Sequence, residues 1–168
     1  MKVLPPPPPG YEIQMPRCEV AAEVTVAGLD PSGREVSLVP AAANAWRAMR
    51  AASEGEGVRL VLLSGFRSVE RQSEIVGRKL EAGMPLEKVL RVNAYPGHSE
   101  HHTGRAVDLG APGAAPLSEE FEHTPEFAWL KARAGSFGFS MTYPRSNVHG
   151  IVYEPWHWCM SDASAARG

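Results

Sequence analysis

The 168-residue chain has little of what several classes of protein need. No apolar run approaches the roughly 20 residues that a membrane-spanning helix requires. Seventeen basic and nineteen acidic residues give a net charge of −2, which argues against the broad positive surface of a protein that binds nucleic acid. The hydrophobic fraction of 43% and the charged fraction of 21% are typical of a globular protein. A chain of this length predicts one domain with one active site.

Cysteine is scarce. Cys18 and Cys159 lie far apart in the sequence, and neither belongs to a Cys-x-x-Cys pair. This excludes a cysteine metal cage and a scaffold dense in disulfides. Separation along the chain does not give distance in space, so one disulfide and two free thiols are equally compatible with the sequence.

The N-terminus shows no apolar export signal, because Lys2 is followed almost directly by five prolines at positions 5–9. Consecutive prolines favour an extended polyproline II segment that lacks backbone donors. We therefore expect a proline-rich spacer over residues 1–10, a folded domain over 11–160 and a polar tail over 161–168.

Within the folded domain, hydrophobic patterns and turn residues predict both helices and strands. Residues 18–26 and an apolar patch ending at Val39 predict a hairpin around the turn at 28–33. The other expected elements are helices over 41–52, 68–82, 86–92 and 124–134, and strands over 58–63, 105–109, 137–141, 150–153 and 156–159. This order predicts an α+β domain with a mainly antiparallel sheet and flanking helices.

Three of the six histidines cluster in the polar segment His98-Ser99-Glu100-His101-His102-Thr103-Gly104-Arg105-Ala106-Val107-Asp108. If residues 105–109 form a strand, a loop that folds back before Gly104 can bring His101 beside Asp108. His98 and His102 compete with His101 on sequence alone, and the spacing to Gly104 and Asp108 favours His101. A third ligand, His157, is available in Glu154-Pro155-Trp156-His157.

These residue types suit zinc, which binds imidazole nitrogen and carboxylate oxygen and keeps its fourth position open for water in catalytic sites. Zinc lowers the pKa of that water from about 15.7 towards about 7. Glu154 is then the natural general base, since this task needs proximity but no metal bond. Arg67 follows the strand expected at 58–63 and can place a positive charge against the oxyanion of a tetrahedral intermediate.

Four segments carry a resemblance to a known family. They are Ser64-Gly65-Phe66-Arg67-Ser68 with Gln72, the run from Pro96 to Asp108, Gly138-Phe139 with Tyr143-Pro144, and the run from Gly150 to Trp158. The most specific element is Ser-x-His-x-x-Gly-x-Ala-x-Asp followed by Glu-Pro-Trp-His. Together these segments resemble the D-alanyl-D-alanine carboxypeptidases and dipeptidases associated with vancomycin resistance.

The resemblance implies a zinc-bearing α+β fold shared with lysostaphin-type endopeptidases and the hedgehog signalling domain. It implies hydrolysis next to a D-amino acid in peptidoglycan stem peptides, with D-Ala-D-Ala carboxypeptidase preferred over dipeptidase or endopeptidase. The residue roles it implies are zinc binding by His101, Asp108 and His157, general base catalysis by Glu154, transition-state stabilisation by Arg67, and contacts to substrate or to neighbouring site residues by Ser99 and Gln72.

A different class of function is a non-catalytic, zinc-stabilised module that binds cell wall. The presence of both Glu154 and Arg67 speaks against it. Family members that trim cell wall normally carry an export signal or anchor, and this chain shows neither. We therefore expect either a truncated form of an envelope enzyme or an enzyme that works inside the cell on free dipeptide or recycled wall fragments.

Structural roles also compete for several of these residues. His98 is expected to bond within its own loop, His102 to face solvent or substrate, and His123 and His149 to lie on the surface. Trp156 and Trp158 alternate with His157, so both are expected on the opposite face of the sheet. Cys159 can share the face of His157, where a fourth thiolate ligand would close the site and argue against catalysis.

Overall fold

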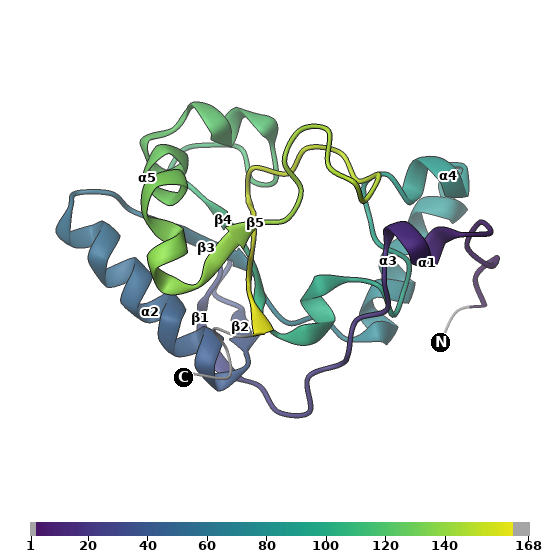
Figure 1. The fold of residues 1–168 in the computed structure, drawn as a ribbon, viewed down its shortest axis with the longest axis horizontal. Helices are drawn as coiled ribbons and strands as arrows, with labels where there is room; N and C mark the ends of the chain where they lie inside the picture. The colour runs from purple at the N-terminus through teal and green to yellow at the C-terminus, as the bar shows by residue number, and fades with distance from the viewer. Residues whose placement is uncertain (1–2, 163–168) are drawn as a thin grey trace.

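The structure, a computed structural model, describes residues 3–162. Its main sheet is antiparallel and has four strands in the order β3 (Val61–Ser64), β4 (Ala106–Gly110), β6 (His157–Met160) and β5 (Phe139–Met141). A separate hairpin consists of β1 (Thr25–Leu29) and β2 (Glu35–Leu38). The strands lie between two groups of helices in Figure 1: α2 (Pro40–Gly55) and α5 (Pro125–Arg133) on one side, and α1 (Tyr11–Gln14), α3 (Val69–Glu81) and α4 (Leu86–Val89) on the other. The expected α+β fold is confirmed.

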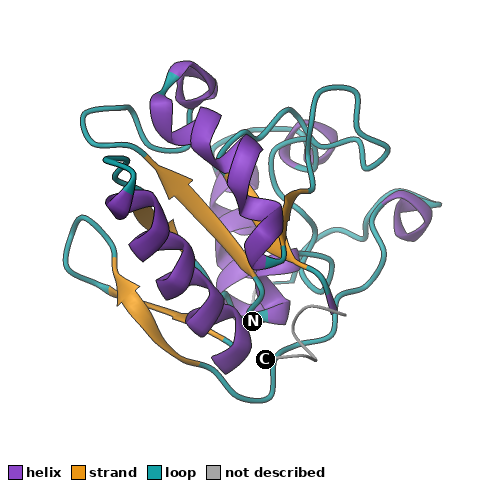
Figure 2. Ribbon diagram, turned by 60° about the vertical axis from the view of Figure 1, so that its left-hand side comes forward, coloured by secondary structure: helices purple, strands orange, loops and turns teal. Residues whose placement is uncertain are grey.

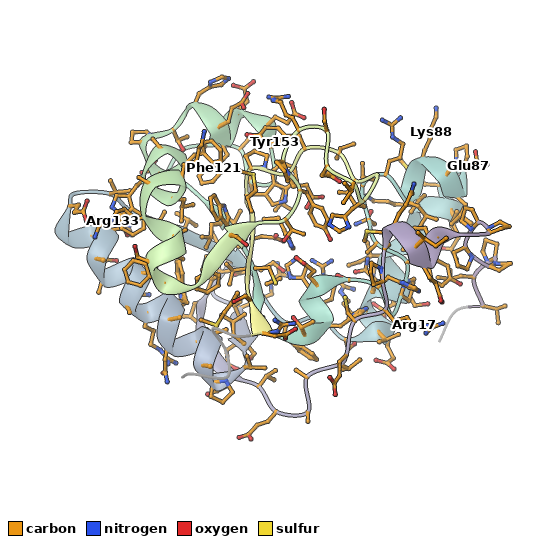
Figure 3. The ribbon with its side chains drawn as sticks, in the orientation of Figure 1. Arg17, Glu87, Lys88, Phe121, Arg133 and Tyr153 are labelled. Carbon is orange, nitrogen blue, oxygen red and sulfur yellow. The ribbon has the colours of Figure 1, made fainter. Side chains whose placement is uncertain are left out.

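The larger hydrophobic core lies where α2 and α5 pack on the sheet. Its most buried large side chains, at most 1% exposed, include Trp46, Met49, Leu109, Leu130 and Phe139. Phe121 and Phe127 meet edge to face in the same core, with ring centroids 5.8 Å apart. On the surface above it, Arg133 at the end of α5 pairs with Glu56 just beyond α2 (Figure 3). One face of the sheet is thus fully used for packing.

The two best-marked helices begin where their capping residues predict. Ser68 accepts a hydrogen bond from the backbone N–H of Arg71, at 3.1 Å, and starts α3. Thr124 accepts one from the N–H of Phe127, at 3.2 Å, and is followed by proline at the first position of α5. A side-chain oxygen at the N-cap satisfies a backbone donor that the helix leaves free, so these starts follow from local chemistry.

The expected hairpin forms but its first strand starts later than expected, and a second expected strand is missing; both stretches are loop, which Figure 2 draws in teal. The hairpin begins at Thr25 instead of residue 18, because the preceding backbone bonds to the histidine-rich loop: the N–H of Cys18 donates to Gly97 O and that of Ala21 to His102 O. Residues 150–153 form no strand. The N–H of Val152 donates to Arg91 O in a single bond that no ladder continues.

Four short elements were not expected: helix α1, and the 3₁₀ turns Glu100–Thr103, Glu119–His123 and Ala134–Phe137. Cys18 and Cys159 are free thiols, which decides the question left open by their spacing. Among the described helices, none has the length and apolar character needed to cross a membrane. Of the proposed polar tail, residues 163–168 lie outside the described residues.

Candidate active site

Strand pairing places two of the expected ligands side by side. In the register of β4 with β6, Asp108 lies directly opposite His157. Val107 and Leu109 are fully buried in the core, so the alternation of a strand turns Asp108 to the opposite face of the sheet. The cross-strand pair therefore projects away from the core, where a cleft opens.

His101 reaches the same place from the 3₁₀ turn Glu100–Thr103. Ser99 caps this turn by accepting from the N–H of His101, at 3.3 Å. Gly104 ends it with φ 66°, and a Cβ at Gly104 would lie 2.9 Å from Val39 Cγ1. Only glycine meets both demands, a left-handed backbone and a close neighbour. The turn thus delivers His101 beside Asp108 just before β4 begins.

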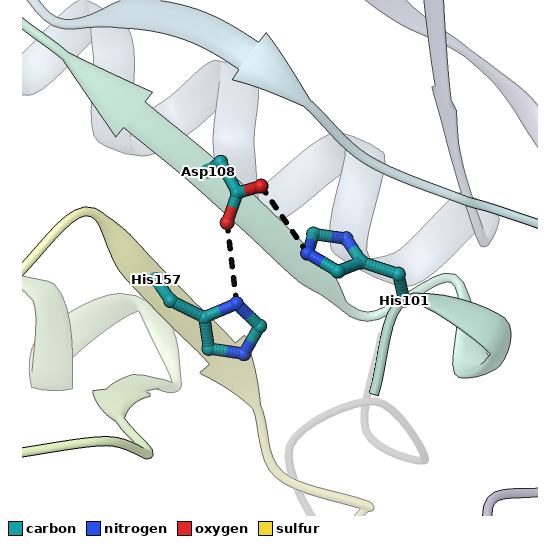
Figure 4. A group of neighbouring side chains, drawn as sticks. All are labelled: His101, Asp108 and His157. Carbon is teal, nitrogen blue, oxygen red and sulfur yellow. Dashed lines mark hydrogen bonds and ion pairs between the residues drawn. The ribbon is translucent and has the colours of Figure 1, made fainter. Parts of the chain in front are cut away.

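The three side chains converge on one another, as Figure 4 shows. His101 Nε2 lies 3.3 Å from Asp108 Oδ2, and His157 Nδ1 lies 3.2 Å from Asp108 Oδ1. One ligand atom from each residue lies within 4.8 Å of the others, and each residue is at most 5% exposed. Tetrahedral zinc with bonds of 2.0–2.1 Å separates its ligand atoms by about 3.3 Å. The donor set and its spacing therefore fit zinc.

The outer nitrogen of each imidazole is already engaged. His101 Nδ1 bonds to the carbonyl oxygen of Gly65 at 2.7 Å, and His157 Nε2 bonds to Glu100 Oε2 at 2.8 Å. Thr142 Oγ1 donates to the same oxygen of Glu100, at 2.7 Å. These partners orient both rings so that His101 Nε2 and His157 Nδ1 face the cluster, which is how proteins orient metal-binding histidines. Sequence reasoning missed Glu100, although it lies between Ser99 and His101 in the motif.

The charges of the cluster favour a bound cation. Burial raises the pKa of Asp108, but His101 and His157 outweigh this and hold it well below its usual value. Burial lowers the pKa of His157, yet hydrogen bonds to Asp108 and Glu100 more than offset it and raise that pKa to about 10. Burial lowers the pKa of His101. A buried carboxylate between two imidazoles attracts positive charge, which a proton or a metal ion can supply.

Glu154 lies beside the cluster, with Oε2 4.0 Å from His157 Nδ1. Its backbone N–H donates to Tyr143 O, which fixes the residue at the entrance to β6. Burial raises the pKa of Glu154 to about 7; His157 opposes this shift and Asp108 adds to it. A carboxyl group with such a pKa can take up and release a proton near neutral pH.

Arg67 supplies positive charge at the same place. Its Nη2 lies 4.0 Å from Asp108 Oδ2, and its Nη1 donates to Gln72 Oε1 at 2.9 Å. Gln72 Nε2 in turn donates to the carbonyl oxygen of Ala94 at 2.6 Å, so both ends of this amide are occupied. At 1% exposure, Gln72 is placed to hold Arg67 more than to touch a substrate.

All seven expected site residues line one cleft of about 290 Å³. They share it with residues that sequence reasoning did not select, namely Lys79, Val92, Asn93, Ala94, Leu117, Tyr143, Ile151, Val152 and Trp156. The ring centroids of Tyr143 and His157 are 4.8 Å apart, and Tyr143 forms the cleft wall together with Ile151. Tyr143 and Ile151 stand in segments that carry the family resemblance, but sequence reasoning assigned neither a role, because each wall position depends on which distant segment it faces.

Two of the competing histidines have structural roles, and the expectations for both were wrong. His98 Nδ1 bonds outside its loop, to Met15 O at 2.6 Å. His102 is fully buried, with Nδ1 bonded to Arg67 O at 2.6 Å and Nε2 accepting from the N–H of Gly97 at 3.0 Å. Both imidazoles brace the loop that carries His101.

The residues around β6 follow the expectation only in part. Trp158 is buried against Phe127 in the core, as predicted. Trp156 packs against the same core but is only partly buried and also lines the cleft, because β6 begins at His157 and the alternation of a strand does not extend back to residue 156. The thiol of Cys159 contacts Met160 O at 3.6 Å and does not belong to the His-Asp-His cluster.

Comparison with known proteins gives this geometry a family. Residues 35–162 match VanY, described as D-alanyl-D-alanine carboxypeptidase. The chain belongs to the VanY family. The matched range contains every expected site residue, and it confirms the resemblance carried by the sequence motifs.

Among curated relatives, the VanY-family chain is 35% identical to YodJ of Bacillus subtilis over 129 residues, which cover 75% of this chain and 47% of YodJ. It is 31% identical over 134 residues to the bifunctional D-Ala-D-Ala dipeptidase and D-Ala-D-Ala carboxypeptidase VanXYC of Enterococcus gallinarum, covering 76% of this chain and 68% of VanXYC. The chain spans less than half the length of three curated relatives that it matches.

Solved structures confirm the fold. The LdcB LD-carboxypeptidase superposes with a TM-score of 0.77 at 29% identity, covering 88% of this chain and 73% of LdcB. VanYB in complex with D-alanine-D-alanine superposes with a TM-score of 0.68 at 25% identity, covering 90% of this chain and 85% of VanYB. A VanY variant in complex with Zn(II) superposes with a TM-score of 0.63 at 26% identity, covering 89% of this chain and 83% of the variant.

Proposed function

We propose that this protein is a zinc-dependent carboxypeptidase that removes the terminal D-alanine from peptidoglycan stem peptides ending in D-Ala-D-Ala. The observation that carries the proposal is the buried His101-Asp108-His157 cluster with Glu154 beside it and Arg67 facing the same cleft. Membership of the VanY family supports the reaction. The relatives solved with Zn(II) and with D-alanine-D-alanine support the metal and the ligand.

The proposed roles follow from the geometry. Zinc held by His101, Asp108 and His157 would lower the pKa of a water molecule towards about 7 and polarise the carbonyl group of the substrate. Glu154 takes a proton from the attacking water and passes it to the leaving amine as the C–N bond breaks. Arg67 stabilises the negative charge that develops on the carbonyl oxygen.

Gln72 and Ser99 receive positioning roles in this proposal. Gln72 holds the guanidinium group of Arg67 through its amide oxygen. Ser99 caps the turn that carries His101 and also lines the cleft, so its hydroxyl group is available to a bound peptide. The backbone N–H of Arg67 also donates to His101 O, at 3.1 Å, which keeps the cation and the metal ligand at a fixed separation.

A second candidate is release of D-alanine from an L,D bond, favoured by the TM-score of 0.77 to the LdcB LD-carboxypeptidase. Mass spectrometry separates the candidates when the zinc-loaded protein is given two synthetic stem peptides, one ending in L-Lys-D-Ala-D-Ala and one in L-Lys-D-Ala. Loss of D-alanine from the first alone supports the D,D reaction, whereas loss from the second supports the L,D reaction. Cleavage of free D-Ala-D-Ala would indicate a dipeptidase, and internal fragments an endopeptidase.

Glu154→Gln tests the general base of the proposed reaction. We expect the rate to fall about 10²–10⁴-fold, because a positioned general base contributes that much, while one equivalent of zinc stays bound. Glu87→Gln makes the same change at an exposed position on α4 and should leave the rate unchanged. If the unsubstituted, zinc-loaded protein leaves every peptide intact yet binds cell wall, the non-catalytic module replaces this proposal.

A further inference from the structure

The cleft contains a second cationic side chain that the proposed mechanism does not use. Lys79 lies on α3 seven residues after Gln72, and both line the cleft. Seven residues are about two helical turns, so the two side chains share one face of α3, about 10 Å apart along its axis. Side chains on a helix lean towards its N-terminus, which brings the ammonium group of Lys79 back towards Gln72 and the site.

A short stretch of backbone ties both residues to the cleft wall. Gln72 Nε2 donates to Ala94 O at 2.6 Å, and Lys79 Nζ donates to the side-chain oxygen of Asn93, next to Ala94, at 2.5 Å. The segment containing Asn93 and Ala94 therefore runs along α3. It holds the half-buried Lys79 at the edge of the cleft.

The charge of Lys79 is held by a neutral partner. Its bonded acceptor is an amide oxygen, whereas Arg67, the other non-histidine cation of the cleft, lies 4.0 Å from the carboxylate of Asp108. Burial lowers the pKa of Lys79, and the negative charge of Glu154, which lines the same cleft, acts in the opposite direction. Lys79 makes no ion pair with a carboxylate within residues 3–162, and such a cation in a substrate cleft suits an anionic group of the ligand.

We propose that Lys79 and the amide group of Asn93 form a subsite for a carboxylate of the substrate, namely the terminal carboxylate of the residue to be released. The inference rests on the proposed carboxypeptidase function. An ammonium group donates to carboxylate oxygens, and an Asn amide adds two further donors. Such a subsite would make the protein select chain ends over internal bonds. A side-chain carboxylate elsewhere in the peptide has the same chemistry, and the experiment separates the two sources.

The test compares Lys79→Gln, which removes the charge, with Lys79→Arg, which keeps it. The substrates are a peptide ending in D-Ala-D-Ala with a free carboxylate, the same peptide as a C-terminal amide, and a free-acid peptide with an additional carboxylate on its third residue. For free acids, Lys79→Gln should raise KM about 10–100-fold, as expected for a lost charged hydrogen bond, with kcat within about twofold. Lys79→Arg should recover most of the affinity.

The amide substrate gives the decisive comparison. The unsubstituted enzyme should prefer the free acid, and Lys79→Gln should abolish that preference. Asn93→Asp places a negative charge in the same subsite without removing Lys79, and it should raise KM for the free acid as well. Lys88→Gln, at an exposed position on α4, is the matched control and should leave KM, kcat and the preference for the free acid unchanged.

Two outcomes would overturn the assignment. If Lys79→Gln still prefers the free acid as strongly as the unsubstituted enzyme does, Lys79 does not recognise the terminal carboxylate. If Lys79→Gln raises KM only for the peptide with the extra carboxylate, Lys79 contacts a side-chain carboxylate instead. A binding measurement separates this inference from the proposed function. Zinc-loaded Glu154→Gln, titrated with D-Ala-D-Ala and its amide with and without Lys79→Gln, reports the subsite even if no peptide is hydrolysed.

Discussion

His157 is held between two carboxylates, so a proton is the main competitor of a zinc ion at this residue. Its Nδ1 faces Asp108 and its Nε2 faces Glu100, and these hydrogen bonds raise its pKa to about 10 against the effect of burial. Zinc binds only the neutral imidazole, so it must displace that proton. We expect the apparent zinc affinity to rise about tenfold per pH unit between pH 7 and 9, because the proton becomes a weaker competitor. Competition with a chelator at each pH measures this slope.

Glu100 helps to raise the pKa of His157 and so extends the pH range over which the zinc affinity rises. Glu100→Gln removes one of the two negative charges and should lower the pKa of His157, so its affinity curve should level off at a lower pH. Thr142→Val removes only the hydroxyl group that donates to Glu100 and keeps the carboxylate, so its curve should stay steep. Identical slopes for Glu100→Gln and the unsubstituted protein would contradict the role assigned to this pair.

Gln72 offers a second test at the residue scale, because its two possible roles affect different kinetic constants. If it positions Arg67, Gln72→Leu should lower kcat about tenfold or more through misplacement of the guanidinium group, with KM changed by no more than about twofold. A contact to the substrate would instead raise KM and leave kcat largely intact. Steady-state kinetics on a D-Ala-D-Ala peptide distinguishes the two outcomes.

At the scale of elements, the sequence was most informative where local chemistry alone decides the structure. The starts of α3 and α5 follow from Ser68 and from Thr124 with Pro125, whose side chains satisfy backbone donors within three residues. The strand expected at 150–153 failed because an apolar run has no means of showing whether a partner strand lies beside it. The backbone there accepts from the side chain of Asn147 in the preceding turn and donates to Arg91, a distant residue that no local pattern connects to it.

Gly65 links a strand end to a metal ligand, which makes it a test of how elements position the site. It follows β3, its carbonyl oxygen accepts from His101, and an added Cβ would lie 2.6 Å from the carbonyl oxygen of Ser37 near the end of β2. Gly65→Ala should therefore destabilise the fold by about 1–3 kcal/mol, as overpacking typically does, and should weaken zinc binding. Gly55→Ala, where an added Cβ meets nothing within 4 Å, should be neutral. Denaturant unfolding and zinc titration of both variants measure the effects.

For the whole molecule, the sequence predicted which residues gather in the cleft better than it predicted their surroundings. The spacing within residues 98–108 and the later Glu154-Pro155-Trp156-His157 sufficed to select the cluster that the fold brings together. Glu100 and Tyr143 stood in the quoted motifs without a role, and Lys79 stood outside them, because the importance of each depends on which distant segment it faces. A sequence motif predicts the reactive residues of a site, whereas the residues that form the wall of a cleft depend on how the complete chain packs.

The cluster joins β4, β6 and the turn Glu100–Thr103, so a bound zinc ion should stabilise the entire domain. A ligand that binds only the folded state adds about 2.7 kcal/mol at 100 times its Kd, which for a domain of this size raises Tm by roughly 5–11 °C. Removal of zinc by a chelator should reverse that shift. His157→Ala should show almost no shift with zinc, and Glu154→Gln should show all of it, because Glu154 is assigned to the reaction and not to the metal. Calorimetric scans with and without zinc would contradict this division of roles if Glu154→Gln lost the shift or if His157→Ala retained it.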